Sequence, residues 1–160
     1  MIFPTKFDFD LAKGQISTPD KARGFIAANF VWLSNYSHYL DTLIRERIDN
    51  YRLEEAEYRD LKLCLAILFF CFQDCPETPL TAIGELKKNL PGTKPGHYNH
   101  PVFERTDELI HQNFRTMFES FDSFVRSEYI TVYDEVMEVS RIFILAVFYA
   151  EIKRTEAIYN

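Results

Sequence analysis

Glycine and proline are scarce in this chain, with 5 and 7 of the 160 residues. Few turn-forming residues allow few chain reversals, which favours a small number of long helices over many short strands. The longest apolar runs, 63–72 and 142–150, fall short of the roughly 18 residues that a membrane-spanning helix needs. We therefore expect both runs to be buried helix centres. The opening residues also lack the apolar stretch of a secretory signal, because Asp8 and Asp10 interrupt it.

Cysteine is too rare and too clustered for a disulfide framework. The three cysteines, Cys64, Cys71 and Cys75, are an odd number within one segment. This pattern predicts a reducing compartment, and hence a cytoplasmic protein. Cys71 and Cys75 lie near the end of a predicted helix, where the dipole disfavours a thiolate, so packing is expected of them and not nucleophilic chemistry.

Positive charge is also in short supply, since the net charge is −6 and the sequence pI is about 5.2. Nucleic-acid binding needs a basic surface that releases counterions from phosphates, so no nucleic-acid partner is expected. The sequence has no glycine-rich phosphate loop, no Gly-x-Ser-x-Gly elbow and no His-Glu-x-x-His motif. We accordingly predict no catalytic residues, no metal and no cofactor.

Aromatic and apolar residues are plentiful. Hydrophobic residues make up 47% of the chain, and phenylalanine (15) outnumbers leucine (14). The length suits one domain that can bury most of its apolar surface. We predict a single helical domain over 1–160, an irregular all-α bundle of five to six helices with an aromatic-rich core.

Helical periodicity and capping residues place these helices along the chain. Thr18 as N-cap and Pro19 in the first turn start a long helix, and Thr78 with Pro79 repeat the signal. The predicted helices are 19–49, 53–74, 79–90, one beginning at Pro101, and 132–157, with a break or a bend near Arg126–Thr131. Residues 1–16 are predicted to be an extended arm, and 91–101 a Gly/Pro-rich loop.

One stripe of polar residues needs separate consideration as a metal site. His100, Glu104, Asp107 and His111 share one side of a helix at spacings of four, three and four. Imidazole and carboxylate ligands suit zinc, iron or manganese. A di-iron bundle needs a second Glu-x-x-His motif besides Glu108–His111, and the chain has none. A metal-binding bundle is therefore the weakest alternative.

A second alternative comes from Arg105 and His111. Their spacing resembles the Arg-x(4–6)-His motif of HEPN-domain ribonucleases, which are small all-helical proteins. The resemblance implies a dimeric RNA-cleaving enzyme in which these two residues act at the subunit interface. It is confined to two residues in one segment. Thr106 stands where that family usually has asparagine or another polar residue, and the surrounding sequence is acidic.

The strongest functional signal is the charge of the segment from Pro101 to Glu138. It holds nine acidic residues and three basic ones, an excess equal to the net charge of the whole chain. Such a surface can attract a basic protein and accelerate its encounter, and exposed tyrosines can anchor the contact. We predict a non-catalytic protein-binding domain, specifically an acidic immunity- or antitoxin-like inhibitor of a basic partner such as a nuclease toxin. The predicted partner-binding residues are Glu104, Glu108, Glu119, Asp122, Glu128, Tyr129, Tyr133, Asp134 and Glu135.

Overall fold

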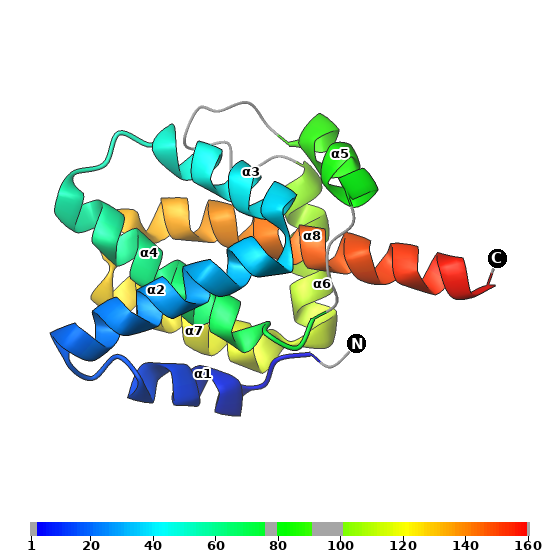
Figure 1. Cartoon of the computed structure of the whole chain (residues 1–160). Coiled ribbons are helices and arrows are strands. Elements are labelled where there is room, and N and C mark those ends of the chain that lie inside the picture. The colour runs from blue at the N-terminus through cyan, green and yellow to red at the C-terminus, as the bar shows by residue number, and fades with distance from the viewer. Residues whose placement is uncertain (1–2, 76–79, 91–100, 160) are drawn as a thin grey trace.

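The computed structural model describes residues 3–75, 80–90 and 101–159, which are helical and contain no strand. The helices are α1 (Lys6–Gly14), α2 (Pro19–Tyr36), α3 (His38–Asp49), α4 (Glu55–Cys71), α5 (Leu80–Asn89), α6 (Pro101–Asn113), α7 (Arg115–Glu128), the 3₁₀ helix η1 (Ile130–Val132) and α8 (Tyr133–Tyr159). The all-α prediction is confirmed. The predicted helix count is too low, because eight α-helices occur in the described residues (Figure 1).

The predicted extended arm over 1–16 is wrong, because much of it is helix α1. Thr5 and Asp8 form a capping box, in which the Thr5 backbone N–H donates to the Asp8 carboxylate at 2.7 Å. Phe9 and Ala12, three residues apart, are buried on one face of this helix, which packs against α4 and α7. Phe7, Phe9 and Leu11 alternate along the sequence, which favoured an extended arm, but the capping box and the spacing of the buried residues favour a helix.

The long helix predicted over 19–49 is interrupted at Ser37. This residue has extended backbone angles, and its hydroxyl accepts a hydrogen bond from the Leu40 N–H at 3.2 Å. Ser37 therefore caps α3 while ending α2. Phe114 makes a second unpredicted break, between α6 and α7, and its ring lies among Phe72 and Phe148 in the core.

The sequence predicted either a break or a bend near Arg126–Thr131, and the structure has a break, since α7 ends at Glu128 and α8 begins at Tyr133. The predicted loop 91–101 lies outside the described residues, apart from Pro101, which begins α6.

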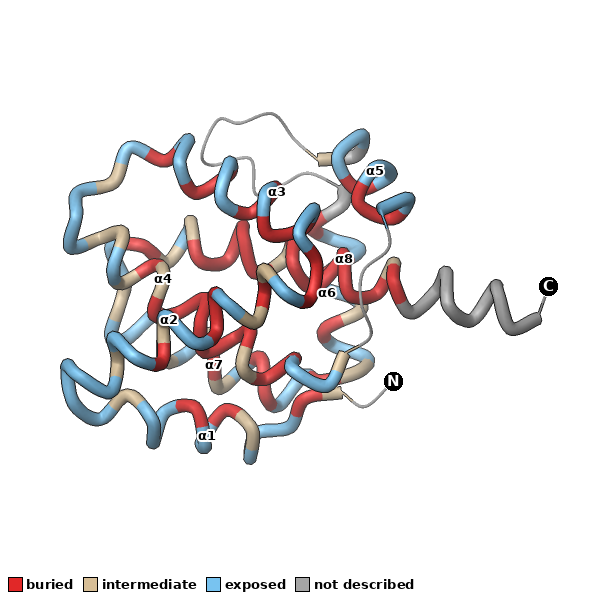
Figure 2. Tube along the Cα trace, viewed as in Figure 1, coloured by how far each residue is buried: buried red, intermediate tan, exposed pale blue. Residues whose placement is uncertain are grey.

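The core is built around α4 and α8, which contact each other and most of the remaining helices. Both present buried residues on most sides, as Figure 2 shows. The ring of Phe143 on α8 contacts Phe69 of α4 and Phe72, the residue after α4, with ring centroids 4.9 and 5.5 Å away. Edge and tilted ring contacts of this kind add to the free energy gained by burying apolar surface. The aromatic core predicted from composition is confirmed.

Candidate protein-interaction surface

The structure spreads the nine predicted partner-binding residues over α6, α7, which carries Glu119 and Asp122, and the start of α8. Glu104 and Glu108 lie on α6, whereas Glu128 and the residues after it lie at the corner where α7 passes into α8. In Figure 1 this corner lies at the left-hand end, beside the start of α4, and α6 lies toward the opposite end. The two groups therefore do not form one continuous surface.

Several of these acidic groups are already paired with arginines of their own helix. The Glu108 carboxylate lies 3.0 Å from the Arg105 guanidinium, and the Glu119 carboxylate lies 2.8 Å from that of Arg115. The Asp122 carboxylate lies 3.5 Å from the guanidinium of Arg126. Exposed pairs of this type stabilise the fold by less than about 1 kcal/mol, but they reduce the field that a partner would meet. The acidic side chains of α6 and the start of α7 thus contribute little net charge.

The two tyrosines of the corner are held by the protein itself. The Tyr133 hydroxyl donates to Asp122 and accepts a hydrogen bond from Arg126, whose guanidinium lies over the Tyr133 ring. Burial, followed by the hydrogen bond to Asp122, raises the pKa of Tyr133 to about 12. Tyr129 is half-buried, with its ring edge-on to Phe124. Both tyrosines fix the turn between α7 and α8.

The remaining acidic residues of the predicted binding set lie beside further acidic residues, at the start of α4, that the sequence analysis did not predict to bind a partner. Glu128, Asp134 and Glu135 gather at the corner, and the 3₁₀ helix there packs against α4. The N-terminal half of α4 and the residue before it add four carboxylates. We call the combined group the acidic end: Glu54, Glu55, Glu57, Asp60, Glu128, Asp134 and Glu135.

Electrostatic coupling links acids of α4 with acids of α8 at the acidic end. Burial raises the pKa of Glu135, and the negative charges of Asp134 and Glu57 raise it further. Burial likewise raises the pKa of Asp60, against the opposing effect of Arg59. The charge of Glu57 on α4 therefore acts on the carboxyl of Glu135 on α8, although the two residues are far apart in sequence.

Two helix N-termini meet at the acidic end, which gives part of the physical reason for its composition. Each terminus carries roughly half a positive charge, so acidic side chains in the first turns of α4 and α8 stabilise those helices. The two dipoles together offset only about one of the seven carboxylate charges. Within the described residues, none of the seven forms an ion pair, and neither do the neighbouring Arg52 and Arg59. A clear excess of negative charge remains at this end.

Glu138, counted in the acidic segment, is removed from the surface altogether. It is fully buried, and its carboxylate forms an ion pair with Arg47 of α3, which is 6% exposed. The Tyr51 hydroxyl lies beside the pair, and burial together with Glu138 raises the pKa of Tyr51 well above its ordinary value. The spacing of charges along the sequence favours local pairing of the arginines in this half of the chain (Arg45, Arg47, Arg52 and Arg59) with nearby glutamates (Glu46, Glu54, Glu55 and Glu57). Arg47 instead pairs with Glu138 on a distant helix.

The residues behind the two alternatives are also placed by the structure. Arg105 and His111 are exposed on α6, with Arg105 bound to Glu108. In the stripe considered as a metal site, Asp107 is paired with Arg141 at 2.8 Å, and His100 lies outside the described residues. No group of three His, Cys, Asp or Glu side chains that could hold a metal occurs in the part of the chain that the structure describes.

The acids at the start of α4 carry no obvious functional signal in the sequence, because arginines stand close to them along the chain and favour local pairing. Arg45 instead binds Asp41 at 2.8 Å, and Arg47 binds Glu138. The available signal was the position of Glu54, Glu55 and Glu57 at a helix start, where acids are favoured by the dipole and need no basic partner.

These features define the class of the protein as an all-α bundle with an acidic end. Comparisons with models of protein families, with curated proteins and with solved structures found no match. Among the described residues, no helix has both the length and the apolar character required to cross a membrane.

Proposed function

We propose that this chain is a non-catalytic protein-binding domain whose acidic end docks on a cationic surface of another protein. The observation that carries the proposal is the convergence of seven carboxylates from α4, α7 and α8 with no ion pair among the described residues. An excess of charge of one sign on a rigid surface attracts an oppositely charged partner and orients it before contact.

The mechanism that we favour is inhibition by occlusion. A protein that acts on nucleic acid carries lysine and arginine side chains where it holds phosphates. Carboxylates on helices α4 and α8 can occupy those side chains and exclude the substrate, as an immunity protein or antitoxin does. The identity of the partner as a nuclease toxin is part of this proposal.

Affinity capture tests the proposal directly. The immobilised chain is incubated with a cell extract at about 0.1 M salt, where charges interact over roughly 10 Å. We expect a protein with a basic surface to be retained and then released when the salt is raised to about 1 M, where that range falls to roughly 3 Å. The affinity of the identified partner is then measured by calorimetry.

Two variants of equal net charge separate the acidic end from overall acidity. The first, Glu55→Gln/Glu128→Gln/Asp134→Asn, neutralises three carboxylates of the acidic end. The matched control, Glu104→Gln/Glu108→Gln/Glu119→Gln, neutralises three others on α6 and α7. We expect the first to weaken binding about 10-fold or more and the control to weaken it much less. Equal losses of affinity in the two variants would show that the acidic end is not the binding surface.

Incubation with RNA distinguishes the binding role from the ribonuclease activity that the spacing of Arg105 and His111 suggests. We expect the purified chain to cleave RNA no faster than an Arg105→Ala/His111→Ala variant. Cleavage that disappears in this variant would replace the binding role with an enzymatic one.

A further inference from the structure

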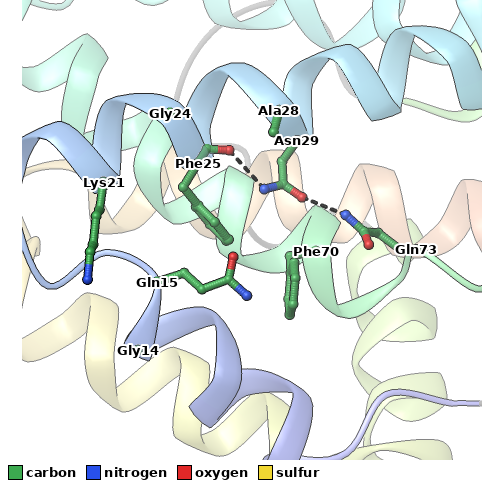
Figure 3. A pocket seen from close by; sticks show the side chains of 9 residues that line it. All are labelled: Gly14, Gln15, Lys21, Gly24, Phe25, Ala28, Asn29, Phe70 and Gln73. Atoms are coloured by element: carbon green, nitrogen blue, oxygen red, sulfur yellow. Dashed lines mark hydrogen bonds between the residues drawn. The ribbon is translucent and has the colours of Figure 1, made fainter.

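A groove lies between the end of α1, the first half of α2 and the end of α4 (Figure 3). Its cavity volume is about 460 Å³, within the range of sites that hold small ligands or short peptides. A second hollow of about 340 Å³ shares Phe70 and Gln73 with it and continues along α1 past Leu11 to Phe3. The two hollows therefore adjoin at Phe70 and Gln73, and we call the pair the channel.

Three carboxamide side chains line the groove. Asn29 is buried, its Nδ2 donates to the Phe25 carbonyl at 2.8 Å, and its Oδ1 accepts from Gln73 Nε2 at 3.0 Å. The second Nδ2 hydrogen, the Gln73 Oε1 atom and the whole Gln15 carboxamide have no hydrogen-bond partner within the described residues. Figure 3 shows the Gln15 carboxamide pointing from the end of α1 toward Phe25 and Asn29. These groups both donate and accept, which matches the backbone of an extended peptide.

The apolar part of the groove is formed by two rings and by exposed helix backbone. The rings of Phe25 and Phe70 lie 5.6 Å apart, and Phe70 is half-buried. A Cβ atom added to Gly14 or Gly24 would meet no atom of the protein within 4 Å. The fold itself therefore does not require glycine at these positions, whereas an occupant close to the α2 backbone would.

The two ends of the channel carry opposite charge. Asp8 and Asp74 line one end, beside the C-terminus of α4, where the helix dipole adds negative charge. Lys21 lines the other end. The nine residues of α1 span roughly 13 Å, which is the length of about four or five extended residues.

We propose that this channel binds an extended peptide of about five residues, with a basic side chain at Asp8 and Asp74 and an acidic group at Lys21. The carboxamides pair with the peptide backbone, and an apolar side chain of the peptide lies against Phe70. The channel uses the C-terminal end of α4, about 24 Å along that helix from the acidic end, so the two proposals stand independently.

Selection from a random heptapeptide library displayed on phage tests this proposal, with the purified chain as target. Gly24→Phe places a large side chain on the wall of the groove, at a position where an added Cβ meets no atom within 4 Å. Gly84→Phe is its matched control in α5, where an added Cβ also meets nothing. We expect wild type and Gly84→Phe to enrich one family of peptides with a basic and an acidic residue at fixed spacing. Synthetic peptides of that family should bind Gly24→Phe about 10-fold more weakly or worse.

A charge swap tests the direction of the peptide. Lys21→Glu should reject the acidic residue and select a basic one at that position. Failure to enrich peptides on the wild type, equal binding to Gly24→Phe, or the same sequences on Lys21→Glu would each overturn the proposal. Dimerisation of the free chain that Gly24→Phe abolishes, seen by light scattering, would assign the groove to a second copy and also overturn it. Thermal melts confirm that each variant is folded.

Discussion

At the scale of single residues, the ion pair of Arg47 and Glu138 is the most unusual feature of the core. Both side chains are almost fully removed from water, and Glu138 Oε2 has no hydrogen-bond partner among the described residues. Burial of two charges is unfavourable, and their attraction offsets much of that penalty only while both are present. The pair therefore fixes the position of α3 on α8 more than it adds stability.

Substitutions in this pair should be strongly non-additive. We expect Arg47→Met or Glu138→Leu alone to lower the free energy of unfolding by about 3–5 kcal/mol, because each leaves an unpaired buried charge. The double variant should recover most of that loss, since it replaces the pair by apolar groups. Urea denaturation measures all three variants. Arg105→Met, which breaks an exposed pair, serves as the control and should change stability by less than about 1 kcal/mol. Additive losses in the double variant would contradict this account.

At the scale of helices, the break at Ser37 decides how the N-terminal half is arranged. The apolar period runs through 19–49 without interruption, so periodicity predicted one straight helix. The Ser37 cap lets the chain change direction, and α3 then packs against α8 with Leu40 and Ile44 buried. A serine within an apolar period is a weak signal, because its hydroxyl can serve a helix interior or a cap equally well.

Removal of the cap should destabilise the protein without removing helices. We expect Ser37→Ala to lower the free energy of unfolding by about 1 kcal/mol, because the Leu40 N–H loses its acceptor. Ser34→Ala, three residues earlier inside α2, is the matched control and should be neutral or slightly stabilising. Thermal unfolding followed by circular dichroism gives both values. Equal effects of the two substitutions would show that the hydroxyl of Ser37 does not act as a cap.

At the scale of the whole molecule, the burial of a thiol and a phenol makes the free energy of unfolding fall as the pH rises through the alkaline range. Burial, followed by the negative charge of the nearby Asp8, raises the pKa of Cys71 from 9.0 to about 12. The folded chain therefore keeps this proton while the unfolded chain releases it, so the stabilisation is complete below about pH 9 and is lost as the pH rises toward 12. Tyr133, with a pKa raised to about 12, acts in the same direction from about pH 10.

We expect the free energy of unfolding to fall by about 2 kcal/mol through Cys71 alone between pH 9 and pH 11. Urea denaturation at pH 7, 9, 10 and 11 measures this fall. Cys71→Ala should start from lower stability and lose about 2 kcal/mol less across the same interval. Parallel pH profiles for the wild type and the variant would mean that another group is responsible.

The sequence by itself determined the helical class, the aromatic core and the positions of most helix starts, and it located a break or a bend before α8. Those features follow from local periodicity, capping and composition, which act over a few residues. Only the tertiary structure decided that Glu138 is buried against Arg47 and that the acids of α4 join those of α8. It also separated α6 from that cluster and placed Gln15, Asn29 and Gln73 around one groove. These relations depend on how helices dock, and docking is set by the packing of side chains distant in sequence, which no local pattern records.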